Sequence, residues 1–302
     1  MTPGARVSAA IEVLDAMAGG LAAEQALPRW ARQSRFAGSK DRAAVRDHVF
    51  DVLRQRRTAA HYGQGETGRA LMIGLLYALE VDLDALFTGE GHAPAPLTEA
   101  ERAFPPAPQD RGTALNLPDW LLPHFDAALG DGAETTARAL QGRAPVCLRV
   151  NLARTTVAAA RDALAEEGVQ TAPNPLAEGA LMVTEGARRI RNSRAFAQGL
   201  IELQDAASQA VVAALPKGGR VLDYCAGGGG KILALAARQP GTWFAHDADP
   251  RRMKDLPARA ERAGCTVSCL STPDTVAQAP YDLVLCDVPC SGSGTWRRAQ
   301  EA

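Results

Sequence analysis

A run of glycines carries the first sign of chemistry in this sequence. Asp223 and Tyr224 lead into Cys225, Ala226, Gly227, Gly228, Gly229, Gly230 and Lys231. The run lies between an expected strand, 219–224, and an expected helix, so its backbone N–H groups can approach a ligand closely. Asp247 follows Asp223 by 24 residues, at the end of the next expected strand, where its carboxylate could accept both hydroxyls of a ribose. The loop alone fits a nucleoside, a dinucleotide or an unliganded turn.

A second motif follows the fourth expected strand of the same region. The segment DVPCSGSGTWRR places Asp287, a proline turn and Cys290 at the carboxyl end of that strand. This edge of a parallel sheet is where ligands bind. A thiol there can add to an electron-poor aromatic carbon once its pKa is lowered. A buried filler role for Cys290 is the alternative, and the glycine-serine loop beside it favours a ligand site.

Composition limits the class of protein. Apolar residues make up 46% and charged residues 22% of the 302 residues, and no apolar run is long enough to span a membrane. The N-terminus lacks a signal peptide, so we expect a cytoplasmic protein. The six cysteines form neither CxxC pairs nor clusters with histidine, so we expect no disulfides and no metal site.

Charge is locally uneven although the net charge is −1. Residues 1–57 carry ten Lys/Arg and six Asp/Glu. The run RRIRNSR contains Arg188, Arg189, Arg191 and Arg194 without an acid. Such a run is usually a solvated face, and contact with RNA phosphates is the alternative.

The spacing of apolar residues predicts three regions. Amphipathic helices are expected at about 3–18, over a single stretch at 41–62 and at 68–80, with a Pro/Gly-rich linker at 89–118. A short helix from 119 and a β-α-β arrangement at 145–195 predict a small α+β module. A helix capped by Asp205 follows. From 218, four strands alternate with helices, and Pro257 interrupts one of these helices. The alternation predicts an α/β fold with a doubly wound parallel sheet, and four strands leave that sheet incomplete.

Four stretches give the sequence a specific resemblance: LRVN at 148–151, LQDAASQ at 203–209, VLDYCAGGGGK at 221–231 and DVPCSGSGTWRR at 287–298. On these, the chain resembles the Sun/Nop2 group of RNA cytosine-C5 methyltransferases, and the bacterial small-subunit ribosomal RNA enzymes within it. The resemblance implies three domains. They are a NusB-like helical RNA-binding domain at 1–110, an RRM-like RNA-binding module at 119–200 and a truncated Rossmann-like class I S-adenosylmethionine-binding domain at 201–302.

The resemblance also implies roles for the motifs. Residues 225–231, with Asp247 and Asp287, would bind S-adenosylmethionine, and Asp287 would contact the cytosine or the cofactor. Cys290 would release the methylated product. The attacking cysteine of the family belongs to a later Thr-Cys motif, which these 302 residues lack, so we expect the chain alone to be inactive. Small-subunit ribosomal RNA is the expected partner and a monomer the expected state. No residue near Ser271, Thr272 and Asp274 is assigned to the adenine.

Two other functions are compatible with parts of the sequence. A non-catalytic RNA-binding protein with a degenerate cofactor domain would also lack the attacking cysteine. A small-molecule dehydrogenase would share the glycine loop, but the Asp-x-Pro-Cys segment argues against it. Binding of S-adenosylhomocysteine without binding of NAD would exclude the dehydrogenase.

Overall fold

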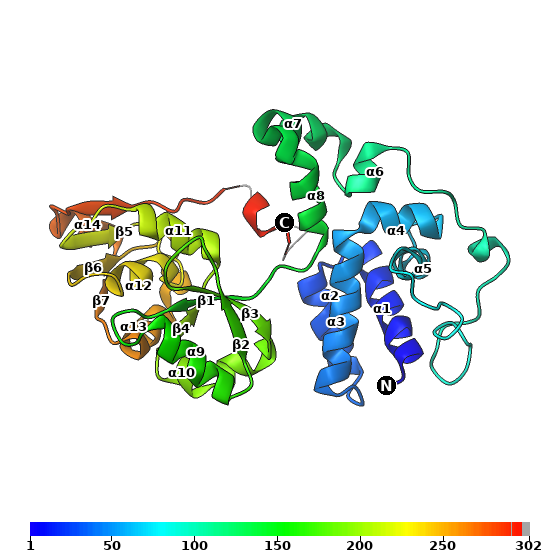
Figure 1. The fold of residues 1–302 in the computed structure, drawn as a ribbon, viewed down its shortest axis with the longest axis horizontal. Helices are drawn as coiled ribbons and strands as arrows, with labels where there is room; N and C mark the ends of the chain where they lie inside the picture. The colour runs from blue at the N-terminus through cyan, green and yellow to red at the C-terminus, as the bar shows by residue number, and fades with distance from the viewer. Residues whose placement is uncertain (291, 298–302) are drawn as a thin grey trace. The chain divides into compact units, whose positions relative to one another are not determined.

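The computed structural model of this chain describes residues 1–290 and 292–297. The chain is divided into two units, each with its own packing. Residues 1–144 form the first unit together with the described residues 292–297, and residues 145–290 form the second. Figure 1 shows the elements of each unit.

The first unit begins with a helical bundle. Thr2 caps its first helix by accepting a hydrogen bond from the backbone of Ala5, and the expected stop at Gly19 is confirmed. The apolar stretch at 68–80 is confirmed as the core helix, where Met72, Ile73 and Leu75 are almost completely buried. The bundle helices are α1 (Pro3–Ala18), α2 (Ala23–Gln33), α3 (Ser39–Arg54), α4 (Arg56–Gly63) and α5 (Gly68–Ala78).

The single helix expected at 41–62 is wrong in one respect: it breaks at Gln55 into α3 and α4. The break lets α4 pack closely on α5, where a Cβ on Gly74 would lie 1.9 Å from the carbonyl oxygen of Ala59. Arg54 is buried and pairs with Asp51. Helix α2 was not predicted.

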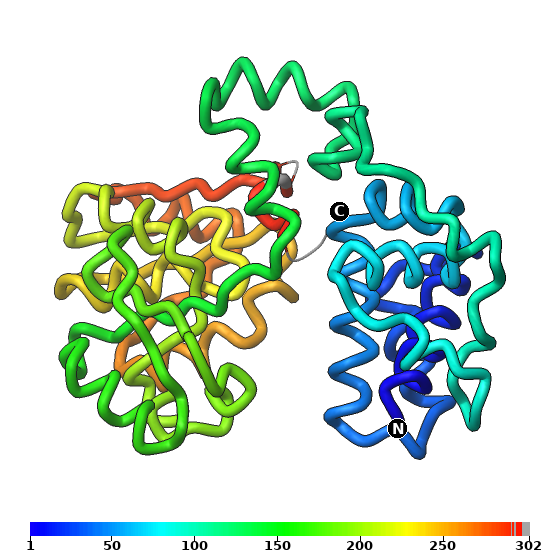
Figure 2. The backbone as a smooth tube through the Cα atoms, turned by 45° about the vertical axis from the view of Figure 1, so that its right-hand side comes forward, coloured from blue at the N-terminus to red at the C-terminus, as the bar shows by residue number. Residues whose placement is uncertain are grey.

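The Pro/Gly-rich segment at 89–118, which was expected to be a linker, packs on the helical bundle. Leu97 is buried in the bundle core, Phe104 stacks on Tyr77 with ring centroids 3.7 Å apart, and Glu101 pairs with Arg69 at 2.7 Å. Figure 2 shows this segment, cyan to teal, running beside the bundle helices. These contacts hold the segment against the helical bundle. The remaining elements are η1 (Ala100–Arg102), α6 (Arg111–Leu115), η2 (Asp119–Leu121), α7 (Leu122–Leu129), η3 (Gly130–Gly132), α8 (Ala133–Gln141) and η6 (Ser293–Thr295).

The second unit opens with an antiparallel sheet in the order β2-β3-β1-β4. With two helical segments between the strands, this β-α-β-β-α-β order is a ferredoxin-like arrangement. The strands that the sequence predicts at 145–153 and 180–186 are present as β1 and β3, and β2 and β4 were not predicted. The elements are β1 (Cys147–Val150), α9 (Val157–Glu166), β2 (Gln170–Pro173), β3 (Ala180–Glu185), η4 (Ala187–Asn192), α10 (Arg194–Ala197) and β4 (Ile201–Leu203).

The predicted parallel sheet is confirmed, with strand order β7-β6-β5-β8 and every pair parallel. The Asp205 cap is present and accepts from the backbone of Ala207. The helix expected around Pro257 is interrupted there: a 3-10 turn ends at Met253 and a new helix, α13, begins at Leu256. Pro257 lies in the first turn of α13, where a missing N–H costs nothing. The elements are α11 (Ala206–Ala214), β5 (Arg220–Asp223), α12 (Gly230–Ala236), β6 (Thr242–Ala245), η5 (Pro250–Met253), α13 (Leu256–Ala263), β7 (Val267–Cys269), α14 (Thr272–Ala277) and β8 (Leu283–Leu285).

Strand order fixes where a ligand should bind. From β5 the chain moves outward through β6 to β7 and then returns to the other side of β5 as β8. The switch point lies at the carboxyl ends of β5 and β8, where open α/β sheets bind their ligands.

Among the described helices none is long and apolar enough to cross a membrane.

Candidate active site

The glycine loop leaves the carboxyl end of β5 in a conformation that depends on two of its glycines. Gly227 and Gly229 have φ of 51° and 81°, in the left-handed region. A Cβ on Gly229 would lie 2.1 Å from the Cδ1 of Leu256 in α13, so both backbone angle and space exclude a side chain there. Gly230 has no such constraint and begins α12.

The loop leaves several amides available. The Gly227 N–H donates to the Oδ2 of Asp247 at 2.9 Å, and the Gly229 N–H to the carbonyl of Ala226 at 2.8 Å. In the described part of the chain, the N–H groups of Gly228, Gly230 and Lys231 donate to no protein acceptor. Backbone amides without partners at a sheet switch point are suited to a polar ligand.

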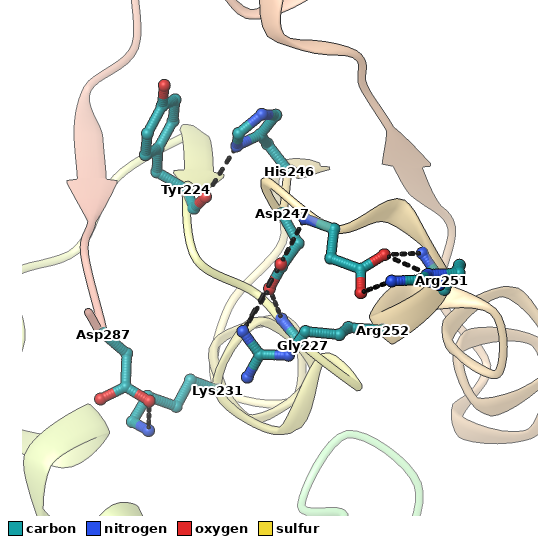
Figure 3. Close-up of polar contacts among 9 residues, drawn as sticks. Tyr224, Gly227, Lys231, His246, Asp247, Arg251, Arg252 and Asp287 are labelled. Carbon is teal, nitrogen blue, oxygen red and sulfur yellow. Dashed lines mark hydrogen bonds and ion pairs between the residues drawn. The ribbon is translucent and has the colours of Figure 1, made fainter. Parts of the chain in front are cut away.

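Asp247 is buried and holds the loop from the end of β6. Its Oδ1 accepts from the Asp249 N–H at 3.0 Å, and its Oδ2 lies 3.3 Å from the Nη1 of Arg252 (Figure 3). The Arg252 side chain is 57% exposed, so a ribose hydroxyl could replace it at the carboxylate. Asp247 therefore fixes the loop, and its carboxylate could also accept from a ligand hydroxyl.

His246 directly follows β6 and lies at the same edge of the sheet. Its Nδ1 is 2.8 Å from the carbonyl oxygen of Tyr224, and its Nε2 is 2.9 Å from the Oγ1 of Thr272. The imidazole stacks on the Tyr224 ring with centroids 4.3 Å apart (Figure 3). The stack fixes the start of the glycine loop. No sequence motif indicated this role for His246.

The carboxylates at β5 and β8 differ sharply in environment. Asp223 is buried, and its Oδ1 has no hydrogen-bond partner among the described residues. Burial raises its pKa to about 6, opposed by the Lys231 ammonium. Asp287 is 56% exposed and pairs with the Lys231 Nζ (Figure 3). The pair joins the glycine loop to the Asp-x-Pro-Cys segment, a contact that the sequence motifs alone did not predict.

The cysteines of the site lie in different surroundings. Cys290 and Cys286 are exposed, and Cys225 is partly buried. Burial raises the pKa of the Cys225 thiol, with smaller contributions in the same direction from Cys286 and Asp247. A raised pKa makes Cys225 a poor nucleophile. In the described residues no cluster of three or more His, Cys, Asp and Glu could hold a metal ion.

Supporting residues come from the ferredoxin-like sheet and were not predicted as part of the site. Arg149 in β1 and Gln204 after β4 both donate to the carbonyl of Gly230, at 2.7 and 3.2 Å. Arg259 of α13 donates to the carbonyl of Gly228 and is oriented by Glu202 of β4. The stretches LRVN and LQDAASQ contain two of these residues, which was the available signal.

Two family models match this chain. Residues 117–188 match the RsmF/B-like methyltransferase ferredoxin-like domain, and residues 210–302 match 16S rRNA methyltransferase RsmB/F. Both segments belong to the RsmB/F methyltransferases. The second match contains the glycine loop, Asp247 and Asp287, so the site described above lies within an RsmB/F methyltransferase domain.

Individual relatives agree with this placement. Ribosomal RNA small subunit methyltransferase B of Xanthomonas campestris pv. campestris is 33% identical over 219 residues, which is 69% of this chain and 49% of that protein. The chain spans about half the length of the curated relatives it matches.

Solved structures support the fold. The structure of PH0851 has a TM-score of 0.71 at 23% identity and covers 100% of this chain and 77% of its own. A methyltransferase homologue from Pyrococcus horikoshii has a TM-score of 0.54 at 30% identity, over 62% of this chain and 64% of its own.

Proposed function

We propose that this chain belongs to an enzyme that methylates cytosine C5 in small-subunit ribosomal RNA with S-adenosylmethionine. One observation carries the proposal: three loop amides with no acceptor among the described residues lie at the switch point of a segment that matches the RsmB/F model, beside an Asp-x-Pro-Cys segment. The relatives named as ribosomal RNA methyltransferases support the substrate class.

The residues present fit the proposed cofactor. The amides of Gly228, Gly230 and Lys231 can bind its polar groups, and Asp247 can accept from ribose hydroxyls. The free Oδ1 of buried Asp223 can accept from an ammonium group, which would also compensate its charge. When bound, the cofactor supplies a methyl group activated by its sulfonium.

The target carbon explains why thiols are needed. Cytosine C5 is a poor nucleophile until a thiolate adds to C6 and makes C5 enamine-like. After C5 takes the methyl group, loss of the C5 proton restores the ring and expels the thiol. The family resemblance assigns the attack to a Thr-Cys motif absent from these 302 residues and the release step to Cys290.

Asp287 is the carboxylate best placed to contact the base. It is exposed at the end of β8 and is oriented by the Lys231 ammonium, which belongs to the proposed cofactor loop. One ion pair would therefore align cytosine and methyl donor.

The NusB-like bundle and the RRM-like module would supply RNA contacts, and the base would leave its stack to enter the site.

The proposal is tested with a protein extended to the full length of its relatives. That protein should transfer methyl groups to undermodified small-subunit ribosomal RNA, and Cys290→Ala should accumulate a covalent protein–RNA adduct that survives denaturing gels. The 302-residue chain should bind S-adenosylhomocysteine without binding NAD. Absence of both binding and transfer would refute the proposal, and free turnover of Cys290→Ala would refute the release role.

A further inference from the structure

Two backbone carbonyls of the glycine loop accept hydrogen bonds from side chains of the ferredoxin-like sheet and of α13. The Gly230 carbonyl accepts from the Nη1 of Arg149 and the Nε2 of Gln204, and the Gly228 carbonyl accepts from Arg259. The N–H groups of the same glycines have no protein acceptor in the described residues. The Gly230 carbonyl shares its planar peptide unit with the available Lys231 N–H, so a side chain that holds this carbonyl also fixes the direction of that amide.

Arg149 is an unusual residue for this position. It is 7% exposed, makes no ion pair with any described residue, and its Nε has no partner. Desolvation lowers the pKa of the guanidinium to about 10, so it remains charged near neutral pH. The Glu202 carboxylate opposes this shift without forming an ion pair with Arg149, and a buried charge without a directly paired carboxylate is costly. Packing alone does not explain why an arginine lies here, because an apolar side chain could fill the same space without burying a charge.

The contacts of Arg149 indicate what the charge does. Its Nη1 also donates to the Oε1 of Gln204 at 2.7 Å, which turns the Gln204 amide so that its Nε2 reaches Gly230. Gln204 in turn accepts from Gln209 through its backbone carbonyl at 3.0 Å. Arg149 thus orients one donor and is itself a charged second donor to the same carbonyl, and such bonds are stronger than neutral ones.

We propose that Arg149 and Gln204 are positioning residues for the cofactor: they fix the Gly230 peptide so that the loop amides are preorganised for it. The ferredoxin-like sheet then acts on the cofactor site directly, besides any contact it makes with RNA. This inference rests on the proposed function, because it concerns the ligand of the same loop.

A matched control exists on the same interface. Asn151 is also buried in the LRVN stretch, and its Nδ2 donates to the carbonyl of Gly199 at 3.0 Å and to the carbonyl of Ala263, at the end of α13, at 2.8 Å. Neither carbonyl belongs to the glycine loop. Asn151→Ala should weaken the contact with α13 while leaving the loop carbonyls anchored.

The experiment compares Arg149→Met, Gln204→Leu and Asn151→Ala in the 302-residue chain by calorimetry with S-adenosylhomocysteine. We expect about a tenfold or larger loss of affinity for Arg149→Met and Gln204→Leu, the size expected for a lost charge-assisted hydrogen bond. Asn151→Ala should bind S-adenosylhomocysteine as tightly as the unsubstituted chain, even if it lowers the melting temperature as much as Arg149→Met does. Arg149→Lys, which retains a charged donor, should recover part of the loss.

A second measurement needs no ligand. Hydrogen exchange of residues 227–231 should accelerate in Arg149→Met and remain unchanged in Asn151→Ala. Equal affinities and equal exchange in these two variants would overturn the positioning role. Failure of the unsubstituted chain to bind S-adenosylhomocysteine would instead count against the proposed function, and the exchange comparison would still decide whether Arg149 fixes the loop.

Discussion

At the scale of single residues, burial gives the two carboxylates of the site different surroundings. Asp223 ends β5 inside the protein, whereas Asp287 follows β8 in solvent beside a lysine. Two acidic side chains at neighbouring strand ends therefore have different properties. The exposed one is available to contact a base, and the buried one is available to a cationic group of the ligand.

Asp223 should make stability depend on pH. Its pKa in the folded chain, about 6, exceeds its ordinary value of 3.8, so the folded state binds the proton more tightly than the unfolded chain. This contribution to stability is present below about pH 4 and is lost as the pH rises through 6, at a cost on the order of 3 kcal/mol. Asp223→Asn should remove this slope in urea unfolding between pH 4.5 and 8. The exposed control Asp131→Asn should retain it, and identical slopes in parent and Asp223→Asn would contradict the assignment.

At the scale of elements, the glycine loop provides two adjacent positions with opposite requirements. Gly229 has positive φ and no room for a Cβ, whereas a Cβ on Gly230 would meet only the Nε2 of Gln204 at 3.7 Å, an ordinary contact. We expect Gly229→Ala to lose about 1–3 kcal/mol of stability and most of its affinity for S-adenosylhomocysteine. Gly230→Ala, in the first turn of α12, should fold as stably as the parent.

Thermal unfolding and calorimetry on the same pair of variants check this prediction. Because both substitutions add one methyl group to neighbouring residues, a difference between them reports on backbone conformation and space at Gly229. Equal behaviour of the two alanine variants would show that the loop is not constrained as described.

Elements that repeat a local pattern could be predicted from the sequence. The four parallel strands, the α5 core helix and the Asp205 cap all follow from periodicity or from one residue beside a helix start. The glycine loop and the Asp-x-Pro-Cys segment were recognised for the same reason. Their placement at one edge of the sheet followed from the rule that parallel strands share one carboxyl edge, whereas the contact between Lys231 and Asp287 was not predicted.

The remaining features depend on partners distant in the sequence. Arg149 contacts a carbonyl 81 residues away, and nothing near it in the chain indicates that its charge would be buried. The 89–118 segment has the composition of a linker, but single apolar residues such as Leu97 fasten it to the bundle. The break at Gln55 is set by how closely α4 must approach α5 at Gly74. Tertiary packing decides each of these.

At the scale of the whole molecule, the arginine run is where nucleic-acid binding by the α+β module can be tested. The structure places the run in η4 and α10, where Arg189 donates to the carbonyl of Glu167 at 3.3 Å. Arg194 lies 3.4 Å from Glu166 and 3.6 Å from Glu167. Its side chain is 71% exposed, and exposed ion pairs contribute little, so a phosphate could replace the carboxylates.

If the run contacts RNA, Arg191→Ala combined with Arg194→Ala should weaken binding of a small-subunit ribosomal RNA fragment. The dependence of log K on log salt should flatten by roughly 0.7 for each lost phosphate contact to a single strand. Titrations at four salt concentrations measure that slope. Arg138→Ala, which removes an arginine paired with Glu134 on the exposed face of α8, is the control for a general loss of positive charge. A slope unchanged in the double variant would make the run a solvated face, and RNA recognition would then have to come from other surfaces of the protein.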